Sequence, residues 1–215
     1  MLGIEDYQTN GVAYPFRLSE ENQGVDLEQK YFDFQERAQE RFGNKVTLKP
    51  NLLSKFFDRL AFDKEVIKNV KMAIGDDIYI WSSAIFFKGP GDGKIVSFHQ
   101  DNPYRQLTTD KVVTAWIALT DCHKENGALE VVPGSHKHGL IKSLDVENAR
   151  SSYLKGEKTT PDDDLLSYKH DIDDFIRENP PIPLDLKAGH FSLHHVNTAH
   201  GSGQNKSKVN RIGFA

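Results

Sequence analysis

Two residues in the stretch IVSFHQDNPY have side chains that could do chemistry together, His99 and Asp101. The residues before them favour a β-strand, and Asn102-Pro103 is typical of a turn. Because alternate side chains of a strand share a face, the imidazole and the carboxylate should point the same way, with Gln100 pointing away. Such a pair can be half of a metal site, a proton-transfer pair or an ordinary hydrogen bond.

A third ligand would favour the metal site. His194 and His195 are adjacent, so a strand would send them to opposite faces, whereas His200 stands at a predicted strand edge before Gly-Ser. Two histidines and one carboxylate, here His99, Asp101 and His200, are the ligand set of non-haem iron enzymes. Zinc uses the same ligand types, but hydrolytic zinc sites of this kind usually carry HExxH on a helix, which this sequence lacks.

Arg211 follows His200 by eleven residues. The turn NKSK (205–208) is expected to bring the strand of Arg211 back antiparallel to the strand of His200, with the guanidinium beside the metal. A guanidinium presents a rigid fork of donors that suits a carboxylate. This arrangement would serve a dicarboxylate cosubstrate that chelates iron at one end and binds Arg211 at the other.

These residues need a scaffold, and the sequence predicts helices first and strands later. Helices are predicted at 19–38, 51–60 and 64–74, the last capped by Asp63 and ended by Gly75. Short strands separated by turns favour an antiparallel barrel or jelly roll. The strands are predicted within 77–87, 95–101, 111–121, 128–132, PIPLDL, HFSLHHV and RIGFA.

We expect a single domain of 215 residues, in which 1–76 form a mainly helical flank and 77–142 and 183–215 form a jelly-roll core. A polar insert at 143–182 contains a predicted short helix, DIDDFIRENP, and is either a solvated excursion or a lid over the site. The predicted fold class is mainly β.

Composition narrows the function further. The net charge of −4 gives no electrostatic case for binding nucleic acid or an anionic membrane. Cys122 is the only cysteine, which excludes an internal disulfide and a cysteine-based zinc site and fits a reducing compartment. No secretory leader or membrane-spanning apolar run is present, so a cytoplasmic location is expected. The oligomeric state is not indicated.

Several motifs, in order, make the chain resemble the phytanoyl-CoA dioxygenase family of iron(II)/2-oxoglutarate-dependent oxygenases. The resemblance covers roughly 10–142 and 183–215 and implies a double-stranded β-helix (cupin-like jelly roll) with N-terminal helices. The matching pieces are NGVAYPFRLSEE, FFKGPG, SFHQD, VTAWIALTD, ENGALEVVPGSHKHG and AGHFSLHHVNTAHGSGQNKSKVNR.

The resemblance also implies roles for single residues. His99, Asp101 and His200 match the iron ligands, Arg211 matches the 2-oxoglutarate anchor, and Ser202 matches a hydroxyl that supports the same carboxylate. The implied cofactors are therefore iron(II), 2-oxoglutarate and oxygen.

Two further residues have looser assignments. Trp116 matches an aromatic residue that lines the cosubstrate pocket, although a plain core position is an alternative. Gln100 is expected to face the substrate side.

The implied activity is hydroxylation of an unactivated C–H bond of a small-molecule metabolite, with release of succinate and carbon dioxide. Halogenation is disfavoured because Asp101 stands where related halogenases have a small residue. The alternatives are a jelly-roll binding or regulatory protein without turnover and a cupin-type zinc hydrolase. The sequence ends four residues after Arg211, where family members generally continue, so we expect a fragment or a shortened C-terminal region.

Overall fold

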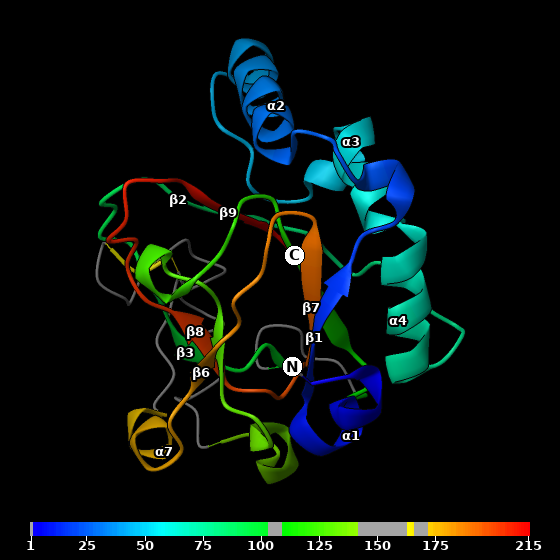
Figure 1. Ribbon diagram of the computed structural model, residues 1–215, viewed down its shortest axis with the longest axis vertical. Helices are drawn as coiled ribbons and strands as arrows, with labels where there is room; N and C mark the ends of the chain where they lie inside the picture. Colours follow the sequence, from blue (N-terminus) through cyan, green and yellow to red (C-terminus); the bar gives the residue numbers. More distant parts are fainter. Residues whose placement is uncertain (1, 103–108, 142–162, 166–171) are drawn as a thin grey trace.

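The computed structural model of the protein describes residues 2–102, 109–141, 163–165 and 172–215 (Figure 1). Within these ranges, nine strands form two sheets in which every pair is antiparallel, and this confirms the predicted jelly-roll class. The five-stranded sheet has the order β1 (Val12–Arg17), β7 (His190–His195), β4 (Val113–Ala118), β9 (Arg211–Phe214) and β2 (Ile85–Lys88). The four-stranded sheet has the order β3 (Val96–His99), β8 (His200–Ser202), β5 (Glu130–Val131) and β6 (Ile182–Pro183).

Helices α2 (Leu27–Phe42), α3 (Lys55–Ala61) and α4 (Lys64–Ile74) flank the five-stranded sheet, and α4 lies next to β1 in Figure 1. The bounds of α4 are those predicted, because the Asp63 carboxylate accepts from the first backbone N–H groups and the chain turns at Gly75. The short helix α1 (Tyr7–Asn10) precedes β1. Short 3-10 turns lie at Ile4–Asp6, Glu20–Asn22, Pro50–Leu52, Lys124–Asn126 and Ser135–His138.

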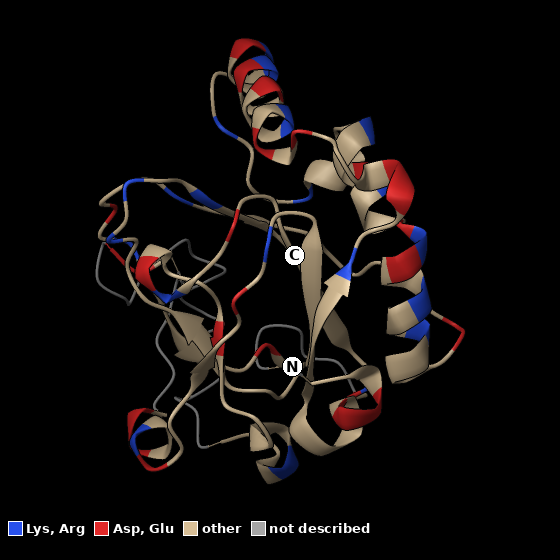
Figure 2. Ribbon diagram, in the orientation of Figure 1, with Lys and Arg blue, Asp and Glu red and all other residues tan. Residues whose placement is uncertain are grey.

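The largest hydrophobic core joins the helices to the outer face of the five-stranded sheet. Phe34 of α2 and Phe57 of α3 pack edge to face, and Phe57 also contacts Phe214 of β9. Charged residues lie mainly on the outer faces of the helices, while β1 and β7 are largely uncharged (Figure 2). A second core, which includes Trp116, Val131 and Leu184, lies between the two sheets. The interior between the two sheets is therefore separate from the core on the helix side.

Several boundaries differ from the sequence predictions. The first helix begins at Leu27 instead of residue 19, because Asp26 is the residue whose side chain caps it. The strand predicted at 77–87 begins only at Ile85, and the preceding residues, which are rich in β-formers, are irregular. Strand β1 was not expected in the helical flank, yet it pairs with β7 at the edge of the larger sheet.

Part of the insert at 143–182 is described. It contains α7 (Asp173–Glu178), where the short helix was predicted, and residues 163–165. Residues 143–162 and 166–171 of the insert lie outside the described residues, and so does the expectation of a lid. Within the described part of the chain, no helix combines the length and the apolar character that crossing a bilayer requires.

Candidate metal centre and cosubstrate pocket

The pairing of β3 with β8 brings together the three residues that the sequence suggested as metal ligands. His99 ends β3 and His200 begins β8, and the two residues are opposite each other in the antiparallel pair. Oδ1 of Asp101 lies 3.7 Å from Nε2 of His99 and 3.9 Å from Nε2 of His200. One ligand atom from each residue lies within 4.8 Å of the others, so a single cation could contact all three.

Hydrogen bonds set the orientation of each ligand. Nδ1 of His99 lies 2.9 Å from the Ser97 carbonyl oxygen, and Nδ1 of His200 lies 2.9 Å from the Thr198 carbonyl oxygen. Because a carbonyl only accepts, each Nδ1 carries the proton and each Nε2 presents its lone pair toward Asp101. The Thr114 hydroxyl donates to Oδ2 of Asp101 at 2.8 Å, and Oδ1 faces the imidazoles.

Burial also keeps the site in a form that suits a metal. The pKa of His200 lies well below its ordinary value, because burial and the neighbouring imidazoles of His99 and His194 disfavour a second proton. A neutral imidazole is the form that binds a metal. The donors present, two imidazole nitrogens and one carboxylate oxygen, therefore fit a divalent ion such as iron(II).

Arg211 is buried on β9, with 2% of its surface exposed. Its Nη2 donates to the Ser202 hydroxyl and its Nη1 to the Phe86 carbonyl, both at 3.3 Å, while Nε is buried without a hydrogen-bond partner. Burial lowers the pKa of Arg211 to about 10, which still leaves it charged at neutral pH. Among the described residues, no carboxylate forms a salt bridge with it, so no protein carboxylate competes with that of a ligand.

The expected pairing of the Arg211 and His200 strands is wrong. β9 belongs to the five-stranded sheet between β4 and β2, whereas β8 belongs to the four-stranded sheet. Arg211 and Ser202 approach each other from opposite sheets. The turn at 205–208 therefore carries the chain from one sheet to the other.

A second buried cation, Lys88, was missed in the sequence. It is opposite Arg211 in the β2–β9 pair and has no exposed surface. Its Nζ lies within hydrogen-bonding distance of three acceptors, the Ser202 hydroxyl at 2.7 Å, the Ser202 carbonyl at 3.2 Å and the Gly203 carbonyl at 2.5 Å. Burial, followed by the charge of Arg211, lowers the pKa of Lys88 to about 6. Its place in the motif FFKGPG was the signal available, but a single lysine after a strand is usually exposed.

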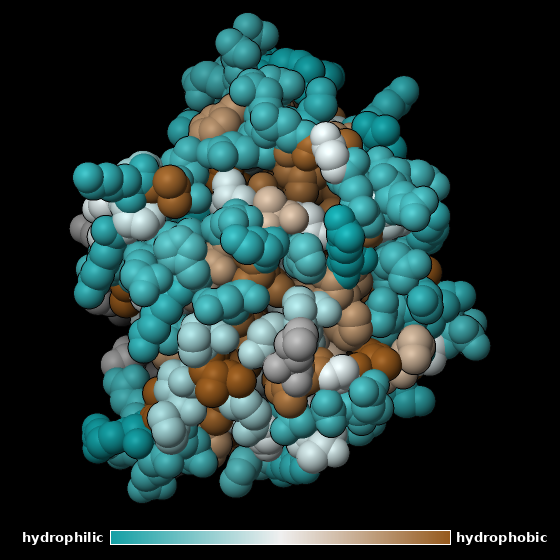
Figure 3. Space-filling model, viewed as in Figure 1, coloured by the Kyte–Doolittle hydropathy of each residue, from teal (hydrophilic) through white to brown (hydrophobic). Residues whose placement is uncertain are grey.

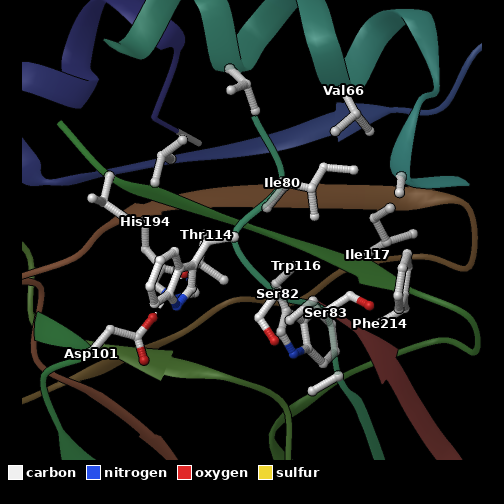
Figure 4. Close-up of a pocket in the computed structure, with 18 of the residues that line it drawn as sticks. Val66, Ile80, Ser82, Ser83, Asp101, Thr114, Trp116, Ile117, His194 and Phe214 are labelled. Carbon is white, nitrogen blue, oxygen red and sulfur yellow. Dashed lines mark hydrogen bonds between the residues drawn. The ribbon is translucent and has the colours of Figure 1, made fainter. Parts of the chain in front are cut away.

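A cavity of about 890 Å³ joins the metal ligands to this cationic end. Asp101, Thr114 and His194 lie together at one side of it, with Trp116 further along (Figure 4). Arg211 and Ser202 also line the cavity, and the guanidinium carbon lies 5.9 Å from the centre of the Trp116 ring. The structure thus places Trp116 in the core between the two sheets and against the cation, and its role in binding the cosubstrate stays a prediction.

The comparisons with known proteins agree with this geometry. A family model described as phytanoyl-CoA dioxygenase (PhyH) matches residues 17–213. The chain belongs to this family.

Relatives of the chain are about 30% identical to it over the aligned residues. Phytanoyl-CoA dioxygenase 1 of Oryza sativa subsp. japonica is 29% identical over 205 residues, which is 91% of this chain and 65% of the relative. A probable alpha-ketoglutarate-dependent hypophosphite dioxygenase of Stutzerimonas stutzeri is 29% identical over 170 residues, 77% of this chain and 55% of the relative. The chain spans about half the length of the curated relatives that it matches.

Solved structures support the same fold. The non-heme monooxygenase ThoJ superposes with a TM-score of 0.73 at 22% identity, covering 98% of this chain and 74% of ThoJ. The epimerase SnoN, solved with Fe3+, alpha ketoglutarate and nogalamycin RO, has a TM-score of 0.67 at 17% identity, covering 98% and 79%. Membership of this family together with the triad agrees with the expected cofactors, iron(II), 2-oxoglutarate and oxygen.

Gln100 does not face the cavity, contrary to expectation. Its side chain is fully buried, and Nε2 donates to the carbonyls of Gly139 and Asn197 at 2.8 and 2.6 Å. Its Oε1 accepts from the N–H of Ile141 at 2.9 Å. Because every polar atom already bonds to the backbone, Gln100 fixes the 133–141 loop and is not available to a substrate.

The adjacent histidines of β7 divide as the strand alternation predicted. His194 is buried and lines the cavity, and its ring centre lies 4.4 Å from that of His200. His195 is half-buried on the other face, near His136 and Tyr7. The metal-ligand role therefore stays with His200, and His194 lies beside it as part of the cavity wall.

Proposed function

We propose that this protein is an iron(II)- and 2-oxoglutarate-dependent dioxygenase that hydroxylates an unactivated C–H bond of a small-molecule substrate and releases succinate and carbon dioxide. One observation carries the proposal: the same cavity is lined by the His99, Asp101 and His200 triad and by the buried Arg211. A dicarboxylate cosubstrate needs both a metal to chelate and a distant cation.

The protein residues have separate tasks in this reaction. His99, Asp101 and His200 would hold iron(II) on one face and leave other coordination positions open. Arg211 would bind the far carboxylate of 2-oxoglutarate beside the Ser202 hydroxyl, and Lys88 would add its charge from behind Ser202. When bound, iron(II), 2-oxoglutarate and oxygen supply the oxidising power, while the protein supplies position and exclusion of water.

Asp101 favours hydroxylation over halogenation. Its Oδ1 faces both imidazoles, and the Thr114 hydroxyl holds Oδ2. A carboxylate oriented in this way would occupy the metal position that a halide would need. Trp116 and the buried walls of the cavity would limit access of bulk water to the reacting centre.

The substrate is a small molecule with an apolar part. Away from the metal ligands, the cavity extends to apolar residues such as Val66, Ile80, Ile117 and Phe214, of which Val66, Ile117 and Phe214 also belong to the core on the helix side (Figure 4). Hydrophobic side chains also appear between the hydrophilic ones on the face shown in Figure 3. The names of the relatives include hypophosphite and ectoine dioxygenases, so family membership supports the cofactor chemistry and leaves the substrate open to a wide range.

The first test uses anaerobic protein with iron(II) and 2-oxoglutarate. Chelation should give a weak visible charge-transfer band, and admission of oxygen should give succinate even without substrate. Arg211→Ala should weaken 2-oxoglutarate binding by about tenfold or more, because a charge-assisted hydrogen bond is lost from a buried site. Arg41→Ala, at an exposed position of α2, is the matched control and should bind as wild type does.

Two results would contradict the proposal. If wild-type protein gives neither the band nor succinate, the jelly roll is a binding protein without turnover. If protein purified without chelator contains stoichiometric zinc and hydrolyses esters or amides, the zinc-hydrolase alternative takes its place. If succinate forms, a metabolite screen for products that have gained one oxygen atom would then identify the substrate.

A further inference from the structure

Each of the two histidine ligands follows, by two residues, a residue with a hydroxyl side chain. The motifs are Ser97-Phe-His99 and Thr198-Ala-His200. In both, the carbonyl of the hydroxyl residue accepts the Nδ1 proton of the histidine at 2.9 Å. The position of that peptide unit therefore decides where each imidazole points.

A distant segment holds each hydroxyl residue in place. The Thr198 hydroxyl donates to the Gly11 carbonyl, next to β1, at 2.7 Å. The Ser97 hydroxyl donates to Oδ2 of Asp164, and the Ser97 backbone N–H donates to Oδ1 of the same carboxylate at 3.3 Å. At both histidines, the hydroxyl residue is thus held by a hydrogen bond to a distant segment, which is Gly11 for Thr198 and Asp164 for Ser97.

Asp164 belongs to the insert and lies beside β3, the edge strand of the four-stranded sheet. It pairs with Ile95 in a parallel bridge, in which the Ile95 N–H donates to the Asp163 carbonyl and the Leu165 N–H donates to the Ile95 carbonyl. Only 2% of Asp164 is exposed. A buried carboxylate is costly unless polar partners satisfy it, and Ser97 offers two donors.

We infer that Asp164 is a positioning residue for the metal ligand His99, acting through Ser97. This inference rests on the proposed metal site. Asp164 holds Ser97 by accepting hydrogen bonds from it, and the Ser97 carbonyl accepts the Nδ1 proton of His99. Nε2 of His99 is then directed toward Asp101. The insert therefore contributes to metal binding without supplying a ligand.

Cobalt(II) binding tests the inference, because Co(II) reports on its ligands through its visible absorption. Asp164→Ala should raise the Kd for Co(II) by about tenfold and change the absorption band, which is the size of effect typical for residues that orient a metal ligand. Asp164→Asn should restore most of the affinity, because the amide can still accept from the Ser97 N–H. Asp163→Ala is the matched control, since Asp163 is the exposed neighbour, and should behave as wild type.

A second pair of variants covers the case in which Asp164→Ala fails to fold. Ser97→Ala removes only the hydroxyl contact, and Thr198→Val removes the equivalent contact at His200; both should weaken Co(II) binding. If wild type binds Co(II) while folded Asp164→Ala, or Ser97→Ala in its place, has the same Kd and band, the inference is wrong and the proposed function stands. If wild type binds no Co(II), the metal site itself fails and the inference with it.

Discussion

Lys88 and Arg211 are two cations on adjacent strands, both buried, and they share the Ser202 hydroxyl. Burying like charges together is unfavourable unless an anion joins them. The pKa of Lys88, lowered to about 6, is the direct consequence, and without a ligand this lysine is mostly neutral at pH 7. A bound carboxylate would reverse that balance and draw a proton onto Lys88.

We therefore predict that 2-oxoglutarate binding takes up close to one proton at pH 7 to 8. Above pH 6 the free protein must first protonate Lys88, so the apparent Kd should rise with pH by up to about tenfold per unit. Calorimetry in two buffers with different ionisation enthalpies counts the protons. In Lys88→Met both the uptake and the pH dependence should disappear; Lys208→Met, at an exposed position, should retain them.

The same pKa has an effect on stability, and its sign is set by which state holds more protons. Between pH 6 and 10.5 the unfolded chain keeps Lys88 protonated while the folded protein does not, so this group makes stability rise with pH. The contribution is about 1.4 kcal/mol per pH unit within that window. The free energy of unfolding of wild type minus that of Lys88→Met, from urea titrations, should increase accordingly; a flat difference would contradict the lowered pKa.

At the scale of elements, β9 holds Arg211 in place through its contact with Trp116 of β4. Gly213 is opposite Ala118 in this pair, and a Cβ at Gly213 would collide with the six-membered ring of Trp116. Glycine is therefore needed here for close approach of the strand to the indole.

Gly213→Ala should lower the free energy of unfolding by about 1–3 kcal/mol, because the core is overpacked, and should weaken 2-oxoglutarate binding as Trp116 shifts against Arg211. Urea denaturation and calorimetry measure the two effects. Gly93→Ala is the control, because its Cβ would meet nothing closer than 3.9 Å. Unchanged stability in Gly213→Ala would show that the indole has room to move.

The elements that the sequence predicted well are those with local signals. Helix α4 has both its caps in the sequence, and the alternation along 113–118 was clear. The irregular segment 77–84 failed because β-forming residues become a strand only when a partner strand is available, and Tyr79, Ile80 and Trp81 are exposed instead. Sequence spacing also could not show which sheet β9 would join.

Because the sequence shows only local signals, it predicted some residues of the site and missed others. The HxD pair on one strand and its match to the family motifs are local features, and they were sufficient to identify the triad residues. Lys88 and Asp164 have no spacing signal, because each reaches its partner only after the chain has folded. Gln100 was misjudged because strand alternation shows that a side chain points away from the triad but not what it then contacts.

At the scale of the whole molecule, the two halves of the site belong to different sheets. The histidine ligands lie on β3 and β8 of the four-stranded sheet, and the cations lie on β2 and β9 of the five-stranded sheet. The described side-chain contacts across this gap include Thr114 to Asp101 and Ser202 to both cations. A cosubstrate that binds metal and cation together would add a further link between the sheets.

Thermal unfolding under anaerobic conditions should therefore show two separate increments. Saturating Mn(II) should raise the Tm, and 2-oxoglutarate at 100 times its Kd should add about 2.7 kcal/mol, or roughly 5–10 °C for a chain of this size. At the same 2-oxoglutarate concentration, Arg211→Ala should keep the metal increment and lose half or more of the second, because the ligand would then be held by one sheet only and a tenfold higher Kd leaves about 1.4 kcal/mol. An equal second increment in Arg211→Ala would mean that the far carboxylate binds elsewhere, and the prediction that 2-oxoglutarate links the two sheets would be wrong.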